Sequence, residues 1–468
     1  MFSETAEFHD WFTQRCRVNS YKVTRVPLDR LDGWSVEKDS GNLTHRSGRF
    51  FSVQGLDVTD SGRAVDAWQQ PVIVQPEHGI LGILVKEFDG VPHCLLQAKM
   101  EPGNVNLVQL SPTVQATKSN YTRVHGGRPV PYLEHFVAPR AGRVLFDALQ
   151  SEQASWFLAK RNRNMIVLTD EDVPVLDDFC WLSFDQVAEL LQIDDLVNMD
   201  TRTVLSGAVA LRPRPAADED DTFSAALANS LRPQARSVHD TTDLLSWFTE
   251  AKGRATLSRR LIPLSGVRDW SAADGVIAHD EGRHFTVLGV AAEAPSREVA
   301  GWTQPMFAPR SRGVIAFLVR RVAGVLHLLV QTRVETGALD RIEMAPTVQC
   351  QPADYAGLRT GRPAFLDEVL SAPPRQIRFD ALQSEEGGRF YHAQSRYLLI
   401  EVDEDFPLEV PPEFAWMTVR QLVDFVRFGS HLNVEARSLL TLLGFLPADA
   451  ERPAAAFGPG LPLLPAVA

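Results

Sequence analysis

The sequence predicts an α+β protein of two similar domains, each a mixed β-sheet with helices on its faces. Three observations carry this prediction. Residues 79–115 and 313–349 align without a gap at a constant offset of 234 (313 − 79). Each copy contains the pattern of a β-hairpin, and helical and strand patterns follow one another without strict βαβ alternation. An internal repeat fixes the architecture, so agreement between the copies indicates a shared fold, and disagreement indicates that their roles have diverged.

Further matches set the limits of the repeat. FDALQSE occurs at 146–152 and 379–385, WQQP at 68–71 returns as WTQP at 302–305, and Asn198 with Arg202 matches Asn433 with Arg437. We therefore expect domains at 8–211 and 244–446, each within the usual range of roughly 50–250 residues, packed as a pseudo-dimer. The segment 212–243, which begins RPRPAADEDD, and the Pro/Ala-rich tail 447–468 have too little apolar content to order themselves. They are predicted to be a linker and a tail.

The expected elements follow from periodicity and turn signals. Strand-like residues 80–88 and 92–98 are joined by Asp89-Gly90, a strong hairpin signal, and residues 314–322 and 325–331 repeat this hairpin. Shorter strands are predicted at 50–56, 165–168, 284–290 and 397–402. Helices are predicted at 8–16, 152–160, 184–191 and 422–428, with Ser183 as the N-cap of the third.

Charge and composition exclude several classes of function. Lys and Arg number 47 and Asp and Glu 59, which gives a net charge of −12 and argues against nucleic acid or an acidic membrane as a partner. No secretory signal and no apolar run of about 18 residues is visible. The four cysteines lie far apart, unlike a disulfide framework or a zinc site. A cytoplasmic protein is therefore expected.

Polar side chains crowd the segment after the first hairpin. PTVQ is identical in both copies although its surroundings differ, and Thr113 and Gln115 alternate with apolar residues as on a strand that faces a pocket. This pattern favours a binding pocket over a solvated loop. The sequence contains no P-loop, GxGxxG, HExxH or CxxC motif, so we expect neither a cofactor nor a metal.

FDALQSE allows two interpretations. It is typical of a helix start, where Asp147, Ser151 or Glu152 caps free N–H groups, and it is equally compatible with direct contact to a ligand. Arg161 and Arg163, with Arg396 in the second copy, are candidates to hold a diphosphate by forked hydrogen bonds. Tryptophans such as Trp34 and Trp302 are expected in the core, and His45 and His279 as structural hydrogen-bonding groups.

The combination of EPGN at 101–104, QLSPTVQATKSNY at 109–121, PYLEHF at 131–136 and FDALQSE resembles the NDP-hexose 2,3-dehydratases of deoxysugar pathways in antibiotic-producing bacteria. The resemblance covers nearly the whole chain. It implies a homodimer whose subunit contains two Nudix-like domains, with a nucleotide-sugar pocket in each copy and no metal. The implied substrate is dTDP-4-keto-6-deoxy-D-glucose and the implied product dTDP-3,4-diketo-2,6-dideoxy-D-glucose, which a downstream 3-ketoreductase captures. The Nudix run G-x5-E-x7-R-E-x2-E-E-x-G is missing, which argues against hydrolysis of the diphosphate.

The implied chemistry is a β-elimination. A base takes the C3 proton beside the C4 ketone, donors stabilise the enolate by about 3–4 kcal/mol each, and an acid helps the C2 hydroxyl to leave. The candidates for these roles in the first copy are Lys99, Tyr121, His125, Tyr132 and Glu134.

The two copies differ at these positions. Arg333 stands in place of Lys99, and Tyr355 is the counterpart of Tyr121. The differences favour catalysis in the first copy and an auxiliary pocket in the second, although a specialised second copy is also compatible with them. The predicted substrate-binding residues are Glu101, Asn104, Gln109, Ser111, Thr113, Gln115, Thr117, Asn120, Gln150, Ser151, Glu152, Arg161, Arg163, Arg333, Glu343, Thr347, Gln349, Tyr355, Gln383, Ser384 and Arg396. A non-catalytic nucleotide-sugar binder and a metal-dependent hydrolase are the rival interpretations.

Overall fold

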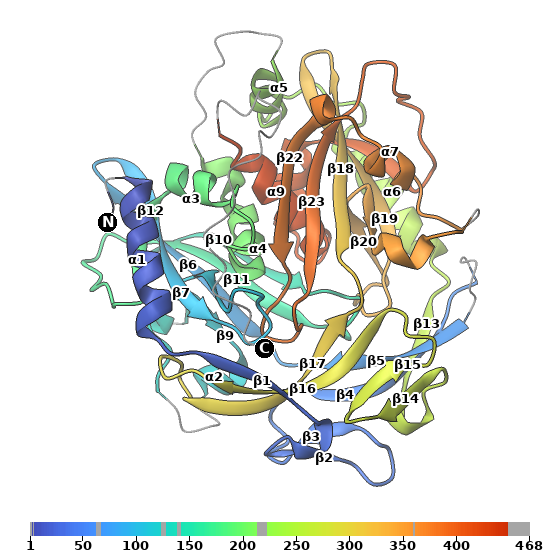
Figure 1. Cartoon of the computed structure of the whole chain (residues 1–468). Coiled ribbons are helices and arrows are strands. Elements are labelled where there is room, and N and C mark those ends of the chain that lie inside the picture. Colours follow the sequence, from blue (N-terminus) through green and yellow to red (C-terminus); the bar gives the residue numbers. More distant parts are fainter. Residues whose placement is uncertain are drawn as a thin grey trace.

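The computed structural model describes residues 2, 4–61, 67–122, 128–137, 142–212, 222–358 and 361–447. Within these ranges the strands form two seven-stranded and two five-stranded sheets. In the view of Figure 1 the two large sheets stand side by side above the two small ones. The chain is therefore a mixed α+β structure with two similar sheet-rich halves.

The first large sheet is built around the predicted hairpin. Its order is β10-β11-β6-β7-β12, with β8 paired to β7 and β9 to β6. The hairpin turns at Asp89 and Gly90, which both have positive φ, as a tight two-residue turn requires. The strands are β6 (Gly79–Phe88), β7 (Val91–Met100), β8 (Val108–Ser111), β9 (Val114–Ala116), β10 (Arg143–Ser151), β11 (Arg161–Leu168) and β12 (Phe179–Ser183).

The second large sheet repeats this arrangement strand for strand. β18 and β23 pair in parallel, as β6 and β11 do, and the other pairs are antiparallel. The strands are β18 (Gly313–Val322), β19 (Val325–Val334), β20 (Ile342–Ala345), β21 (Val348–Cys350), β22 (Ile377–Ser384), β23 (Gln394–Glu401) and β24 (Phe414–Thr418). β6 and β18 are buried over most of their length, because the apolar runs at the centre of each sheet are covered on both faces.

The two small sheets exchange strands between the halves. β1 of the first half pairs with β16 of the second, and β13 of the second half pairs with β4 of the first. One sheet contains β1 (Lys22–Val26), β14 (Trp270–Ala273), β15 (Val276–His279), β16 (Phe285–Glu293) and β17 (Gly301–Pro309). The other contains β2 (Trp34–Val36), β3 (Leu43–His45), β4 (Ser52–Thr59), β5 (Ala67–Val74) and β13 (Ser258–Ile262). The halves are therefore interlocked rather than joined as separate globules.

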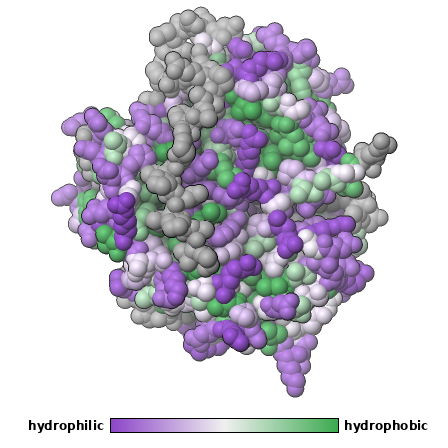
Figure 2. Space-filling view, viewed as in Figure 1, coloured by the Kyte–Doolittle hydropathy of each residue, from purple (hydrophilic) through white to green (hydrophobic). Residues whose placement is uncertain are grey.

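Helices fill the space between the sheets and cover their outer faces. α4 and α9 pack against each other between the large sheets, where Val204 and Leu440 are fully buried in a core that both halves share. No helix among the described residues is long and apolar enough to cross a membrane. The helices are α1 (Thr5–Val18), α2 (Lys118–Tyr121), α3 (Phe184–Leu190), α4 (Met199–Leu205), α5 (Phe223–Ser230), α6 (Thr241–Arg254), α7 (Leu366–Leu370), α8 (Val419–Val426) and α9 (Val434–Gly444). Hydrophilic and hydrophobic residues are interspersed over the face shown in Figure 2.

Three sequence-based expectations need correction. FDALQSE does not start a helix: it lies at the end of β10 and β22, and the helix predicted at 152–160 is a turn followed by the start of β11. The predicted linker 212–243 contains α5, which packs on β19 and whose Ser230 hydroxyl donates to the Leu326 carbonyl at 2.5 Å. The two expected domains are joined more closely than a pseudo-dimer of separate units: each half has an apolar cluster of its own, but a further cluster, the small sheets and the α4–α9 contact cross between the halves.

The strand exchange predicts that the halves stay together without a covalent link. A protease site inserted within 213–221 and then cleaved should leave two fragments that elute together in size-exclusion chromatography. They should separate only in denaturant, because both small sheets and the shared core hold them. Fragments that separate in native buffer would contradict the interlocked arrangement.

Candidate active site

A cavity of about 530 Å³, pocket 1, lies where the first large sheet meets elements of the second half. The first half contributes the ends of β7 and β9, α2, the start of α4 and the region of β2 and β3. The second half contributes the connection between β16 and β17 and the turn after β22. Its charged lining consists of Asp32, Arg46, Lys99, Glu101, Asp200, Arg297, Glu298, Glu386 and Arg389.

Lys99 is a buried amine in this pocket. It lies near the end of β7, its side chain is 5% exposed, and its Nζ donates to the Gln115 carbonyl at 2.8 Å. Burial, together with the nearby charge of Arg297, lowers the pKa of Lys99 to about 8, although Glu298 and Glu101 oppose the shift. A lysine with such a pKa holds a useful fraction of neutral amine near neutral pH and can act as a base.

Carboxyl groups surround this amine. Glu101 accepts hydrogen bonds from Gln115 Nε2 at 2.7 Å and from Asn198 Nδ2 at 3.2 Å. Burial and the charges of Glu152, Glu101 and Glu386 raise the pKa of Asp200, in the first turn of α4, well above its usual range. Burial, opposed by Arg389, raises the pKa of Glu386 to about 8. Protonated carboxyls at neutral pH are suited to donate a proton.

Cations and aromatic rings line the same cavity. Arg297 donates from Nη1 to the Met100 carbonyl at 2.5 Å and lies 5.7 Å from the Trp302 ring. Arg389 lies 4.3 Å from the ring of Phe51. Burial would raise the pKa of Glu298, but Arg297 and Lys99 outweigh it and lower that pKa to about 2. Guanidinium groups suit a diphosphate and aromatic faces suit a planar base, so pocket 1 combines binding and proton-transfer groups.

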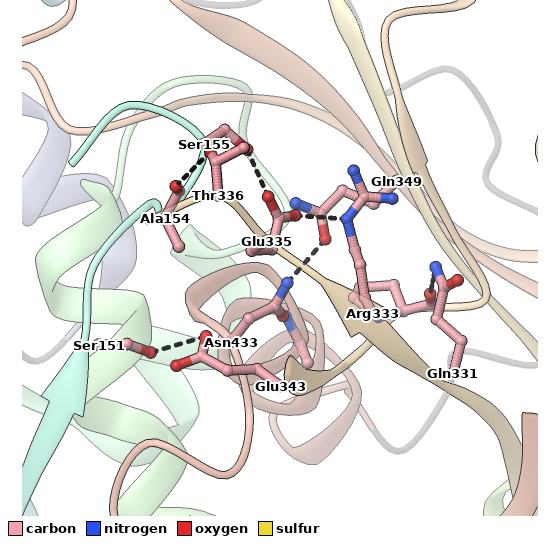
Figure 3. A network of polar contacts seen from close by, with 12 residues as sticks. Ser151, Ala154, Ser155, Gln331, Arg333, Glu335, Thr336, Glu343, Gln349 and Asn433 are labelled. Carbon is pink, nitrogen blue, oxygen red and sulfur yellow. Dashed lines mark hydrogen bonds and ion pairs between the residues drawn. The ribbon is translucent and has the colours of Figure 1, made fainter. Parts of the chain in front are cut away.

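A smaller cavity of about 210 Å³, pocket 2, occupies the equivalent place in the second half. Arg333 donates from Nε to Glu335, which also accepts from Ser155 Oγ at 3.0 Å (Figure 3). Asn433 Nδ2 donates to Gln349 Oε1 at 2.7 Å. Trp156 stands at the repeat position of Arg389 and lines this pocket. Pocket 2 therefore combines an internal pair of Arg333 with Glu335 and two residues that the first half supplies, Ser155 and Trp156.

Part of the sequence-based site lies together in the two pockets. Pocket 1 contains the predicted residues Lys99, Glu101, Gln115, Thr117 and Asn120. Pocket 2 contains the predicted residues Arg333, Gln349 and Tyr355.

Other candidates for acid or base lie elsewhere. The Tyr132 hydroxyl donates to the Pro174 carbonyl at 2.8 Å, and its ring packs against Phe179 in the core. Glu134 follows in a short 3₁₀ helix and does not line pocket 1. Tyr121 packs against the same core, with its hydroxyl 3.4 Å from the His78 carbonyl. His125 lies outside the described residues. Of these candidates, the described residues Tyr121, Tyr132 and Glu134 therefore lie outside the lining of pocket 1.

The identity of PTVQ has a structural cause in its threonine. The Thr113 hydroxyl accepts from the Leu84 N–H at 2.9 Å and donates to the Leu95 carbonyl at 2.5 Å, which bridges β6 and β7. Thr347 makes the same bridge between Leu318 and Leu329 in the second copy. Both threonines are therefore used within their sheets and line neither pocket, whereas the glutamine two positions later lines pocket 1 in the first copy and pocket 2 in the second.

Several predicted binding residues instead join the two halves. Arg202 donates from Nη2 to the Ser384 carbonyl at 2.7 Å, and Arg437 donates from Nη2 to the Ser151 carbonyl at 2.5 Å. Gln109 Nε2 donates to Ser384 Oγ at 2.8 Å, and at the equivalent place Ser151 Oγ donates to Glu343 Oε2 at 3.0 Å. Gln150 donates to the Val426 carbonyl and Gln383 accepts from Arg202. These groups are committed to the contact between the halves.

The remaining predicted residues also lie outside the lining of pocket 1. Arg163 and Arg396 form forked pairs with Asp147 and Asp380, so their guanidinium groups are already bound. Arg161 begins β11 outside the pocket lining, Ser111 donates to its neighbour Pro112, and Asn104 donates weakly to Glu101 at 3.5 Å. Glu152 is buried beside pocket 1 and accepts from the pocket residue Asn162 at 2.7 Å.

Sequence reasoning missed seven charged residues of pocket 1: Asp32, Arg46, Asp200, Arg297, Glu298, Glu386 and Arg389. It also assigned Trp34, Trp302 and His45 to structural roles, although all three line the cavity. For two of the missed charged residues, Glu386 and Arg389, the sequence did contain a usable signal. Glu386 and Arg389 follow the repeated segment FDALQSE, at positions where the first copy has Gln153 and Trp156. Within the described ranges, no group of three or more His, Cys, Asp and Glu side chains is arranged to hold a metal ion.

Comparison with known proteins defines the class. The family model of the NDP-hexose 2,3-dehydratases matches residues 5–208 and 241–443, so the chain belongs to this family. A dTDP-4-dehydro-6-deoxy-alpha-D-glucopyranose 2,3-dehydratase of Streptomyces violaceoruber is 52% identical over 95% of this chain and 98% of its own length. Proteins of the same name from Saccharopolyspora spinosa and Amycolatopsis orientalis are 52% and 49% identical over 94% of this chain, and over 91% and 90% of their own lengths.

The bridging role of Thr113 can be tested directly. Thr113→Val removes the hydroxyl and leaves the buried Leu84 N–H without a hydrogen-bond acceptor. The free energy of unfolding should therefore fall by about 1–3 kcal/mol. Binding of dTDP, measured by calorimetry, should stay within about twofold because the side chain lies outside pocket 1. Thr347→Val is the matched control and should lose similar stability. If the variant kept its stability but lost dTDP binding, Thr113 would have to contact the ligand.

Proposed function

We propose that this chain removes water across C2 and C3 of dTDP-4-keto-6-deoxy-D-glucose to give dTDP-3,4-diketo-2,6-dideoxy-D-glucose. Membership of the dehydratase family and the names of relatives about half identical to the chain support this reaction. The single structural observation that carries it is the buried amine of Lys99 among protonatable carboxyls in pocket 1. A β-elimination needs this combination of a base and an acid.

The reaction begins at C3, whose hydrogen is acidified by the neighbouring C4 ketone. The neutral amine of Lys99 takes this proton, and the electron pair moves to the C4 oxygen as an enolate. The enolate then collapses, the bond from C2 to its hydroxyl breaks, and a pocket carboxyl gives the hydroxyl a proton so that it leaves as water. The resulting 2,3-enol tautomerises to the diketone. The ketone supplied with the substrate provides the activation, so no electron transfer is required.

Binding falls to the other groups of pocket 1. Arg297 and Arg389 are placed to hold the diphosphate by forked, charge-assisted hydrogen bonds. Trp34 and Trp302 offer faces for the thymine ring. The cavity of about 530 Å³ is within the size range of small-molecule sites. Pocket 2, with its smaller volume and internal ion pair, remains a candidate for auxiliary binding through Arg333, Gln349 and Tyr355.

Finer features belong to the same proposal. Each half is a Nudix-like domain, an assignment that the mixed sheets with a parallel central pair support. The protein works as a cytoplasmic homodimer without a cofactor. A 3-ketoreductase captures the reactive product.

The base is tested by Lys99→Arg, which keeps the charge but cannot lose the proton near neutral pH. Turnover of dTDP-4-keto-6-deoxyglucose, followed by loss of the 2-hydroxyl in mass spectrometry, should fall by about 10²-fold or more. In the unmodified protein kcat/KM should rise as pH increases towards about 8, because Lys99 then loses its proton. The exposed Lys38→Arg is the matched control and should keep full turnover. If Lys99→Arg retained normal turnover, another group would have to be the base.

A further inference from the structure

The two pockets can be compared position by position, because the repeat aligns the turns that follow β10 and β22. Glu386 aligns with Gln153 at the offset of FDALQSE (386 − 153 = 233), and Lys99 aligns with Arg333 (333 − 99 = 234). Glu386 lines pocket 1 and Gln153 lines pocket 2. Pocket 1 thus holds two groups that change protonation near neutral pH, where pocket 2 holds an amide and a guanidinium that do not.

The other carboxyls in and beside pocket 1 do not single out an acid. Asp32 lies exposed at the rim, 3.6 Å from Arg46. Glu101 and Asp200 of the lining, and Glu152 beside it, align with carboxyl groups in the second copy, namely Glu335, Glu435 and Glu385. Glu298 has a pKa lowered to about 2, despite its burial, by Arg297 and Lys99, so it stays ionised and cannot donate a proton. Among these groups, Glu386 alone combines a raised pKa with a counterpart that cannot titrate.

The surroundings of Glu386 leave it available to a ligand. Its Oε2 is buried and has no hydrogen-bond partner among the described residues. At the equivalent place Gln153 is engaged, because its Nε2 donates to Glu385 Oε2 at 3.2 Å. A buried carboxylate oxygen without a partner is costly, and binding of a hydroxylated ligand would relieve that cost.

Gly388 makes room for this carboxyl. A Cβ at Gly388 would lie 2.8 Å from Glu386 Oε1 and 3.5 Å from Glu101 Oε1. The aligned residue in the other copy is Ser155 (388 − 155 = 233), whose hydroxyl donates to Glu335 at 3.0 Å. The side chain that occupies this space in pocket 2 is therefore absent from pocket 1. The turn itself is docked on the first half, since the Gly103 N–H donates to the Gly387 carbonyl at 2.8 Å.

We propose that Glu386, supplied by the second half, is the acid that protonates the departing C2 hydroxyl in pocket 1, and that pocket 2 does not catalyse the reaction. This inference rests on the proposed dehydratase function. The active site is then composite: the base comes from β7 of the first half and the acid from the turn after β22 of the second.

The proton balance of the step closes. Lys99 gains the C3 proton and becomes an ammonium ion, while Glu386 gives its proton to the C2 oxygen and becomes a carboxylate. Water leaves with the electron pair of the broken bond, and the pair from C3 forms the new double bond between C2 and C3. Transfer of one proton from the ammonium to the carboxylate restores both groups.

The test uses the full-length protein, with dTDP-4-keto-6-deoxyglucose as substrate. Glu386→Gln, which installs the residue of pocket 2, should lower kcat by about 10²-fold or more while dTDP binding stays within about threefold. The pH profile separates catalysis from a structural role. In the unmodified protein kcat/KM should fall above about pH 8 as Glu386 loses its proton, and this alkaline decline should vanish in Glu386→Gln.

Further variants keep the outcome interpretable. Glu386→Asp keeps a titratable group and should recover part of the turnover together with the alkaline decline. Gly388→Ser should lower turnover by crowding the carboxyl. Glu368→Gln makes the same chemical change at an exposed site on α7 and should leave turnover unaltered. Normal turnover and an unchanged pH profile in Glu386→Gln would overturn the inference, whereas failure of the unmodified protein to release water would overturn the proposed function itself.

Discussion

Two buried arginines hold the structure in the form that the active site requires. Arg202 reaches from α4 of the first half to the end of β22, and Arg437 reaches from α9 of the second half to the end of β10. Both are fully buried, and each binds a backbone carbonyl next to a glutamate: Glu385, which lines pocket 2, or Glu152, which lies beside pocket 1. The terminal nitrogens of both guanidinium groups are hydrogen-bonded, which offsets the cost of burying their charge, so these contacts fix the two halves relative to each other.

This constraint explains why the cavity of the first half depends on the second. The turn after β22 brings Glu386 and Arg389 to pocket 1, and the connection between β16 and β17 brings Arg297 and Glu298. The arginines offset the negative charge of the acidic groups in this confined space. Burial lowers the pKa of Lys99 and raises the pKa of Asp200. Both shifts favour the neutral forms, which are the forms an elimination uses as base and acid.

The sequence was sufficient wherever local chemistry decides the structure. The hairpin of β6 and β7 follows from an apolar run on either side of Asp89-Gly90, and α3 begins at Ser183, whose side chain forms a capping box with Gln186. Of the two interpretations of FDALQSE, the helix start is wrong, because the segment forms the end of β10 and of β22. Its polar residues conceal the alternation of a strand. Gln150 and Ser151 are buried at the contact between the halves, where they donate hydrogen bonds to Val426 and Glu343 of the second half.

The candidate site was predictable only in part, because some of its residues are close together in the sequence and others are not. Lys99, Glu101 and Gln115 stand on one polar segment and could be grouped by proximity in sequence. Asp200, Arg297 and Glu386 arrive from three distant segments, and spacing along a single chain carries no information about such contacts. Tyr132 had the right chemistry for an acid, but its ring was taken into the core with Phe179. Comparison of the two copies at Glu386 and Gln153 was the one sequence signal that pointed across the halves.

The most direct test is a crystal structure with the substrate, or an unreactive analogue of it, bound to the full chain. The account predicts the sugar in pocket 1, with Lys99 Nζ beside C3, Glu386 beside the C2 oxygen, and Arg297 and Arg389 on the diphosphate. A sugar ring seated in pocket 2 alone, or one in pocket 1 with Glu386 turned away from C2, would contradict it.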